Sequence, residues 1–249
     1  MRRTPIVILG MLCLLAAALW PGSGAVRSAD ETRVLCSILP VYAFTQAVVG
    51  DDPHVSVELL VPSQAGCPHD YSLRPRDVQA VLAADVIVTH GLGAETFLND
   101  PAFAEKQTSM LSISDTCEAI FVGDHEQCDH EHDHEHEANI HAWVSPAQAV
   151  RQARLLKDKL PARLPMAGRE RYRANADTLI QRLEALDREY RTASQQFANR
   201  TIVTFHEAFD YLARDYGLEV AATMSGAHSE SPSDWGKRFR LRRESQPIR

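Results

Sequence analysis

A single uninterrupted stretch constrains the fold of this chain most strongly. After Gly168, apolar residues recur every three or four positions up to Asn199, charged residues lie between them, and neither proline nor glycine breaks the series. This period predicts one amphipathic helix, which at 1.5 Å per residue would be about 45 Å long. The alternative is an ordinary amphipathic core helix, which would differ from this predicted helix only in being shorter. We place the helix at 166–199 and expect it to join two parts of the molecule; its apolar positions are Tyr172, Ala176, Leu179, Ile180, Leu183, Leu186, Tyr190 and Phe197.

Short strand-like and helix-like segments alternate on both sides of this helix. Such alternation favours mostly parallel sheets with helices on their faces. We therefore predict an α/β fold in two lobes, an N-terminal lobe at 26–165 and a C-terminal lobe at 200–249. The predicted strands are 34–39, 55–61, 85–89, 201–205 and 218–223, and the predicted helices are 41–49, 77–84 and 207–216.

The last segment of the chain departs from this pattern. Residues 236–249 contain six basic residues and show no sustained periodicity. The second lobe is therefore expected to be incomplete and to end in a basic tail.

The first 25 residues have the three parts of a secretory signal peptide. Arg2 and Arg3 give a basic start, 6–20 form an apolar core, and 21–25 end it with proline and small residues. Cleavage after Ala25 fits the small-residue rule, and the apolar run is short for a membrane span. An uncleaved anchor is the alternative. We expect export into a periplasmic space.

The acidic balance of the chain limits its partners. The formal net charge is −7 with histidine neutral, and the predicted signal peptide carries two of the positive charges. Proteins that bind nucleic acid carry basic patches. A nucleic-acid partner is therefore not expected, and a cationic ligand is favoured.

Four cysteines follow the predicted signal peptide. An exported protein can form disulfides, but four cysteines allow three pairings and the sequence selects none of them. The first lies in an apolar strand-like run, where a buried small residue is expected. No CxxC pair is present, so a thiolate zinc site is not supported. The cysteines are Cys36, Cys67, Cys117 and Cys128.

Residues 124–137, DHEQCDHEHDHEHE, form the strongest compositional signal for metal binding. Five of the 14 positions are histidine and seven are acidic, with almost nothing apolar to bury. We predict a mobile loop that binds metal weakly and exchanges it fast, because its many ligand sets have no fixed geometry. A solvated linker that binds metal only incidentally is the alternative. The loop histidines are His125, His130, His132, His134 and His136.

Three single histidines stand apart from this loop, each at the end of a predicted element. His69 follows the second strand, His141 precedes a helix start, and His206 follows the fourth strand. Neutral imidazole is a good zinc ligand, and three or four ligands complete a tetrahedral site. Each histidine alone is more often an ordinary hydrogen-bonded residue. Their occurrence together with the acidic histidine loop favours a metal site.

Several motifs occur in the order typical of the zinc/manganese substrate-binding proteins of ABC transporters. The first is HDYSLRPRDV at 69–78, with ADVIV at 84–88. The acidic histidine loop follows, then HAWVSP at 141–146 and TFHEAF at 204–209, with Tyr211-Leu212 and Tyr216-Gly217-Leu218 after it. The chain resembles this family over about residues 33–223.

The resemblance implies two α/β lobes joined by one long rigid helix, in a periplasmic protein that delivers metal to the membrane permease of an ABC transporter. It implies that His69, His141 and His206 are the metal ligands. Family members with a histidine-rich loop are zinc-specific, and imidazole suits zinc whereas carboxylate and water suit manganese. Zn²⁺ is therefore the expected cargo, and Mn²⁺ is less favoured.

Two features depart from the family pattern. Pro68 stands where some zinc-binding members carry an acid that can join the metal. The resemblance also ends before the carboxylate ligand that the second lobe of the family normally offers, and the chain continues after Pro232 into the basic tail 236–249. We expect a truncation or a frameshift, with water or a loop histidine in the fourth zinc position.

The predicted function is capture of Zn²⁺ by a monomeric carrier that is not an enzyme. A zinc hydrolase is one alternative, with Glu207 as general base. Asp210, however, stands where an HExxH motif requires its second histidine. A metal buffer or an adhesin without a transporter is the other alternative. Gly91-Leu92-Gly93 lacks the remaining glycine of a phosphate-binding loop and is expected to be a turn at a strand end.

Overall fold

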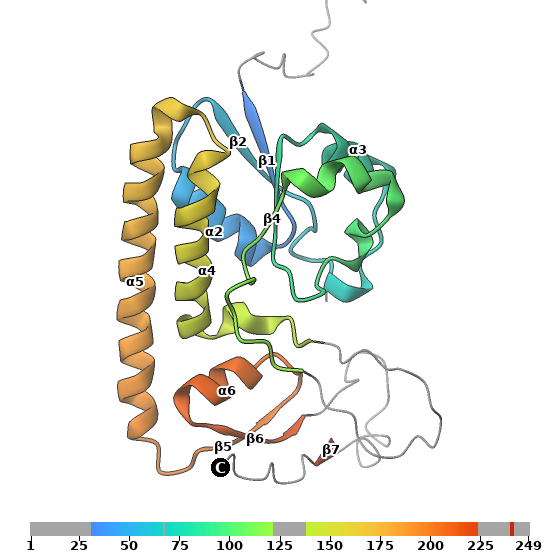
Figure 1. The fold of residues 1–249 in the computed structure, drawn as a ribbon. Coiled ribbons are helices and arrows are strands. Elements are labelled where there is room, and N and C mark those ends of the chain that lie inside the picture. Colours follow the sequence, from blue (N-terminus) through green and yellow to red (C-terminus); the bar gives the residue numbers. More distant parts are fainter. Residues whose placement is uncertain (1–30, 67, 122–137, 224–239, 242–249) are drawn as a thin grey trace, which may run out of the picture. The chain divides into compact units, whose positions relative to one another are not determined.

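The computed structural model describes residues 31–66, 68–121, 138–223 and 240–241, with only the backbone given at 69, 240 and 241 (Figure 1). The chain divides into two units, 1–31 and 32–249, and every described element belongs to the second. The predicted signal peptide 1–25, all of the loop 124–137 and most of the tail 236–249 lie outside the described residues. The predicted lobe boundaries stay predictions.

The described elements alternate between strands and helices, as the sequence predicts. In chain order they are β1 (Thr32–Cys36), α2 (Leu39–Val49), β2 (Val55–Leu59), η2 (Pro68–Asp70), α3 (Pro75–Ala83), β3 (Val86–Thr89), η3 (Thr96–Leu98), η4 (Pro101–Ser109), β4 (Met110–Ser112), η5 (His141–Val144), α4 (Pro146–Lys159), η6 (Leu160–Ala162), η7 (Met166–Gly168), α5 (Arg169–Gln195), β5 (Thr201–Thr204), α6 (Asp210–Tyr216), β6 (Glu219–Thr223) and β7 (Arg240–Leu241), where η marks a 3-10 helix.

Two sheets carry the strands, and all pairings but one are parallel. The first has the order β2-β1-β3-β4, with Leu35 of β1 opposite Ile87 of β3. The second has the order β5-β6-β7, in which β5 and β6 are parallel and β7 is antiparallel to β6. The α/β prediction with mostly parallel sheets is confirmed. Two residues of the predicted tail, Arg240 and Leu241, pair with β6 through their backbone, which the sequence did not predict.

Several element boundaries differ from the prediction. Helix α2 begins at Leu39 and not at 41, because Pro40 lies in its first turn, where proline's fixed φ is favourable and its missing N–H is not needed. Helix α6 begins at Asp210 and not at 207, since Phe209 has the non-helical ψ of 5°. His206 and Glu207 therefore lie in a connection. Gly217 ends α6 in the left-handed region at φ 66°, as its glycine predicts.

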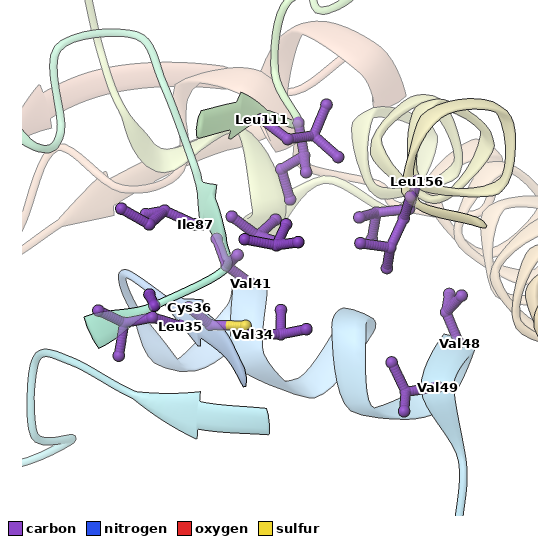
Figure 2. Packing of buried hydrophobic residues seen from close by; sticks show 14 of the residues in the cluster. Val34, Leu35, Cys36, Val41, Val48, Val49, Ile87, Leu111 and Leu156 are labelled. Atoms are coloured by element: carbon purple, nitrogen blue, oxygen red, sulfur yellow. The ribbon is translucent and has the colours of Figure 1, made fainter. Parts of the chain in front are cut away.

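The hydrophobic core lies between the first sheet and helices α2, α4 and α5 (Figure 2). Strand β1 contributes Val34 and Leu35, and α2 contributes Val41 and Val48, all of them buried. Leu156 of α4 packs into the same cluster. Helix α3 contacts β1 and η4, and Figure 1 shows it on the other side of the sheet.

Helix α5 is the long helix that the sequence predicts, but with 27 residues it is shorter than the predicted 166–199 and ends at Gln195, so Phe197 lies outside it. Its first half is buried through Tyr172 and Ala176, which pack against α2 and α4. In its second half the predicted apolar positions Leu186 and Tyr190 are 38% and 40% exposed. There α5 contacts α6. Among the described helices, α5 included, none is both long and apolar enough to cross a membrane.

A buried carboxylate fixes the start of α5. Asp52, in the turn between α2 and β2, accepts hydrogen bonds from the side chains of Arg171 and Tyr172. Burial alone would raise the pKa of this carboxyl, but the hydrogen bonds from Tyr172, the backbone of His54 and Arg171 hold the pKa below its usual value. The long helix is therefore tied to the first sheet by a charged group as well as by apolar contact.

Candidate metal centre

Two of the three predicted ligand histidines lie side by side. The Nε2 atoms of His141 and His206 are 3.0 Å apart, although the residues are 65 positions apart in the chain. Their rings meet edge to face, with centroids separated by 4.7 Å and planes at 86°. The two imidazoles therefore present their outer nitrogens to one point.

Each of these histidines is placed by the end of an element. His141 is the first residue of the 3-10 helix η5, directly before α4, and its side chain is buried. His206 lies two residues beyond the carboxyl end of β5 and is exposed. In parallel sheets, ligands collect outside the carboxyl ends of strands. The pair thus has one buried ring and one ring that faces solvent.

Asn139 contacts His141 twice. Its Oδ1 lies 2.9 Å from the His141 Nδ1 and accepts a hydrogen bond of 2.9 Å from the His141 backbone N–H. Its Nδ2 donates to the carbonyl oxygen of Glu207, at 2.7 Å, and to Oδ2 of Asp210, at 3.1 Å. One carboxamide therefore touches both the first histidine and the segment that follows the second.

The residues that flank the segment 122–137 meet next to this asparagine. The backbone N–H of Asn139 donates to the carbonyl oxygen of Ile120 at 2.7 Å, and Phe121 pairs with Ala138 in an antiparallel bridge. Tyr211 of α6 accepts from the Ile120 N–H and donates to the Asn139 carbonyl oxygen. The Phe121–Ala138 bridge at the base of the segment 122–137 is therefore three residues from His141 along the chain.

A third histidine near the pair is a core residue. His90, directly after β3, is fully buried, and its ring lies 4.7 Å edge to face from the ring of Trp143, which in turn lies 5.2 Å from the ring of His141. Its ring nitrogens are 3.3 Å from the hydroxyl of Ser114. Burial lowers the pKa of His90 to about 3, so the ring is neutral at physiological pH. Sequence reasoning assigned no role to His90.

The buried carboxylate of Glu95 holds the carboxyl ends of β1 and β3. It accepts from the hydroxyl of Ser37, at 2.6 Å, and from the backbone N–H groups of His90 and Gly91. Burial raises the pKa of Glu95 despite these three hydrogen bonds. Gly91-Leu92-Gly93 forms the turn at this strand end, with φ of 88°, 56° and 82°, which confirms the prediction of a strand-end turn. Both oxygens of Glu95 are engaged in holding this turn.

The other predicted ligands are not placed by side-chain contacts. The backbone of His69 lies in η2 after β2, as expected from its position at an element end, but its side chain is outside the described set. The histidines of the loop 124–137 also lie outside the described residues. Within the part of the chain that is described, no group of three or more His, Cys, Asp or Glu side chains could hold a metal ion. The three-histidine site therefore stays a prediction, and the structure supplies two of its members side by side.

The cysteines are not part of this arrangement. Cys36 is a free, fully buried thiol in β1, as predicted, and burial raises its pKa to about 12. Cys117 is also free, and burial raises its pKa to about 11. Thiolate is the form that binds metal, so neither is suited to be a ligand at neutral pH. Cys67 and Cys128 lie outside the described residues.

The family model for the periplasmic component A of the zinc-uptake complex, ZnuA, matches residues 34–237. The chain belongs to this family. The match covers most of the chain and confirms the resemblance to zinc substrate-binding proteins. It also extends past the strand β6, beyond the stretch 33–223 over which the motifs are evident in the sequence.

Individual relatives of this ZnuA-family chain are named as zinc-binding or zinc-uptake proteins. The zinc-binding lipoprotein AdcA of Streptococcus pneumoniae is 29% identical over 238 residues, which make up 94% of this chain and 46% of AdcA. The high-affinity zinc uptake system protein ZnuA of Bacillus subtilis is 30% identical over 231 residues, or 89% of this chain and 71% of that protein. The chain thus spans about half the length of the AdcA relatives that it matches.

A solved structure shows the same fold with zinc bound. The crystal structure of the Zn(II)-bound ZnuA-like domain of Streptococcus pneumoniae AdcA superposes with a TM-score of 0.69 at 27% identity, covering 83% of this chain and 73% of that one. The fold prediction, a mixed α/β protein with parallel sheets and one long helix, is therefore confirmed by comparison as well as by the strand order.

Proposed function

We propose that this chain is the zinc-binding component of a zinc-uptake system, which captures Zn²⁺ between His141 and His206, with His69 as a further ligand. The single observation that carries the proposal is the 3.0 Å separation of the two Nε2 atoms. Two nitrogens bound to one tetrahedral zinc at about 2.0–2.1 Å each are about 3.3 Å apart. The observed pair needs to open by only a few tenths of an ångström to hold the ion.

The surroundings of the pair support capture and release better than catalysis. His206 is exposed and lies in a connection between β5 and α6, so one ligand of the pair can be reached from solvent. Glu207 is the residue that a hydrolase would use as general base, and its backbone carbonyl oxygen accepts a hydrogen bond from the Asn139 side chain. We propose a carrier and not an enzyme, with Zn²⁺ as cargo.

Membership of the family supports a compartment and a partner for this carrier. We propose that it acts in the periplasm as a monomer and passes zinc to the membrane permease of an ABC transporter. The family description, a periplasmic component of a zinc-uptake complex, supports the compartment and the existence of further components. The loop 124–137, whose base adjoins Asn139, is proposed as an auxiliary site of low affinity.

Zinc affinity of matched variants tests the proposal. Competition with a chromophoric chelator should show that His141→Ala and His206→Ala each lose roughly 100-fold or more, because a structural zinc site distributes about 10–16 kcal/mol over three or four ligands. His54→Ala is the matched control, since His54 is exposed and lies in the turn before β2; its affinity should equal that of the parent.

Deletion of 124–137 separates the two candidate sites. We expect this deletion to cost far less affinity than His206→Ala, because the loop offers many equivalent ligand sets and the histidine pair offers one fixed geometry. The opposite order would show that the loop is the zinc site and would refute the proposal.

A further inference from the structure

Asn139 has its four side-chain contacts arranged so that the orientation of its amide is fixed. The Oδ1 faces two nitrogens of His141, one of which is a backbone N–H that can only donate. The Nδ2 faces two oxygens, of Glu207 and Asp210, that can accept. Exchanging the amide oxygen and nitrogen would set donor against donor at the His141 backbone N–H and acceptor against acceptor at Glu207. The contacts therefore assign Oδ1 to the His141 side.

This orientation selects one tautomer of His141. A carbonyl oxygen only accepts, so the Nδ1 that lies 2.9 Å from Oδ1 carries the hydrogen. In the neutral imidazole the lone pair is then on Nε2, the atom that faces His206. Free histidine favours the opposite tautomer. A partner on the far ring nitrogen is the usual way in which a protein orients a metal-binding histidine.

The same amide also reaches the second histidine's segment. Its Nδ2 donates to the carbonyl oxygen of Glu207, the residue directly after His206. The backbone of Asn139 is held separately, by the Ile120 carbonyl oxygen and by the hydroxyl of Tyr211. The side chain is buried and lies 68 positions in the chain from Glu207. It is thus a direct link between the two candidate ligands.

We propose that Asn139 is a positioning residue of the zinc site, which presets the Nδ1–H tautomer of His141 and holds the His206 segment beside it. This inference rests on the proposed zinc capture. Asn139 acts only through the two histidines and does not contact the ion. Its backbone contacts do not depend on the amide, so a side-chain change should leave the fold in place.

The first test measures the tautomer without any metal. Long-range ¹H–¹⁵N NMR spectra of the zinc-free protein, at a pH where imidazole is neutral, report which ring nitrogen of His141 carries the hydrogen; the signal is assigned by its loss in His141→Ala. We expect the Nδ1–H form in the parent and a shift toward the Nε2–H form in Asn139→Ala. A parent in the Nε2–H form, or an unchanged Asn139→Ala spectrum, overturns the proposal.

The second test measures zinc affinity, with the unfolding temperature of the zinc-free protein as control. Asn139→Ala should bind zinc about 10–100-fold more weakly, as is typical when the outer partner of a ligand histidine is removed. The double variant Asn139→Asp/Asp210→Asn keeps an acceptor oxygen for the His141 Nδ1–H but loses the hydrogen bond to the Glu207 carbonyl oxygen. It should restore the Nδ1–H tautomer and recover only part of the affinity that Asn139→Ala loses. The double variant decides the question if Asn139→Ala is destabilised, because a double variant whose His141 is not in the Nδ1–H form overturns the proposal.

Failure of the proposal for Asn139 can be distinguished from failure of the proposed function. If His141→Ala and His206→Ala bind zinc as well as the parent, the function is wrong. If those variants lose zinc while Asn139→Ala keeps both the tautomer and the affinity, only the role of Asn139 is wrong.

Discussion

The two sheets of this protein are stabilised in different ways. All four residues of β3, in the first sheet, are buried, with helices α2 and α3 packed against the sheet from its two sides (Figure 1). In β5, in the second sheet, only Thr204 is buried, Val203 is 52% exposed, and Phe205 directly after the strand is 66% exposed. The first region is held mainly by apolar burial.

Helix α6, beside the second sheet, makes a series of hydrogen bonds to the start of α4 and to α5. Asp215 accepts from the Ser145 hydroxyl at 2.6 Å and from Gln148 Nε2 at 2.7 Å, at the start of α4. The hydroxyl of Tyr216 accepts from the Ala147 N–H and donates to Asp187 of α5. Helix α6 is thus fixed to α4 and α5 by polar groups. The candidate metal centre, with one histidine beside each region, therefore depends on apolar burial as well as on hydrogen bonds.

The largest expected effect lies in the first region. Ile87→Ala removes a fully buried side chain from the central strand β3, and such truncations cost about 2–5 kcal/mol of unfolding free energy through lost burial and a residual cavity. The matched change Val203→Ala in β5 should stay within about 0.5 kcal/mol, as for surface substitutions. Urea unfolding of both variants measures the difference, and equal losses would contradict the contrast between the sheets.

A smaller effect is expected for the polar link beside the metal centre. Tyr211→Phe removes the hydroxyl that bridges the Ile120 N–H and the Asn139 carbonyl oxygen, and leaving such buried groups without a partner costs about 1–3 kcal/mol. Tyr190→Phe, on a ring that is 40% exposed, is the control and should be nearly neutral. Thermal unfolding compares the pair; a neutral Tyr211→Phe would mean that this link adds nothing to stability.

The smallest expected effect on stability comes from an acid-sensitive contact of Asp77 in the first region. Burial opposes ionisation of Asp77, but hydrogen bonds from Arg74 and Tyr71 lower its pKa to about 2. Since the unfolded value is about 3.9, the contribution to stability is complete above pH 4 and is lost as the pH falls from about 4 to about 2. Asp77→Asn should cost about 1–2 kcal/mol near neutrality, after allowance for the partly exposed Arg74.

Urea unfolding of Asp77→Asn and the parent at several pH values checks this dependence. The difference in unfolding free energy between the two proteins should shrink toward pH 2. A difference that is constant over this range would show that the carboxylate charge of Asp77 is not what stabilises the start of α3.

The sequence predicted the elements well where a period or a terminating residue was present. The long apolar period of α5 and the glycine after α6 gave the correct helix and helix end. It missed β4, Met110–Ser112, because three residues are too few to show alternation. The sequence prediction also placed the start of α6 three residues early. Glu207, Ala208 and Phe209 are all compatible with a helix, and only the non-helical backbone of Phe209 shows that the helix starts after it.

The candidate site was predicted in part for similar reasons. His141 and His206 were identified by their positions at element ends, but their 3.0 Å approach is a tertiary fact that spacing does not contain. Asn139 received no role, although an amide two residues before a candidate ligand is a recognisable local partner for its ring. His90 is also at a strand end, and only its complete burial distinguishes it from a ligand.

The approach of His141 and His206 also bears on how the protein should be handled. An ion bound by both imidazoles is a removable cross-link between residues 65 positions apart. Such a ligand adds stability in proportion to the logarithm of its free concentration, about 2.7 kcal/mol at 100 times the dissociation constant. Under the proposed function, a melting temperature of this protein therefore has meaning only together with the free zinc concentration at which it was measured.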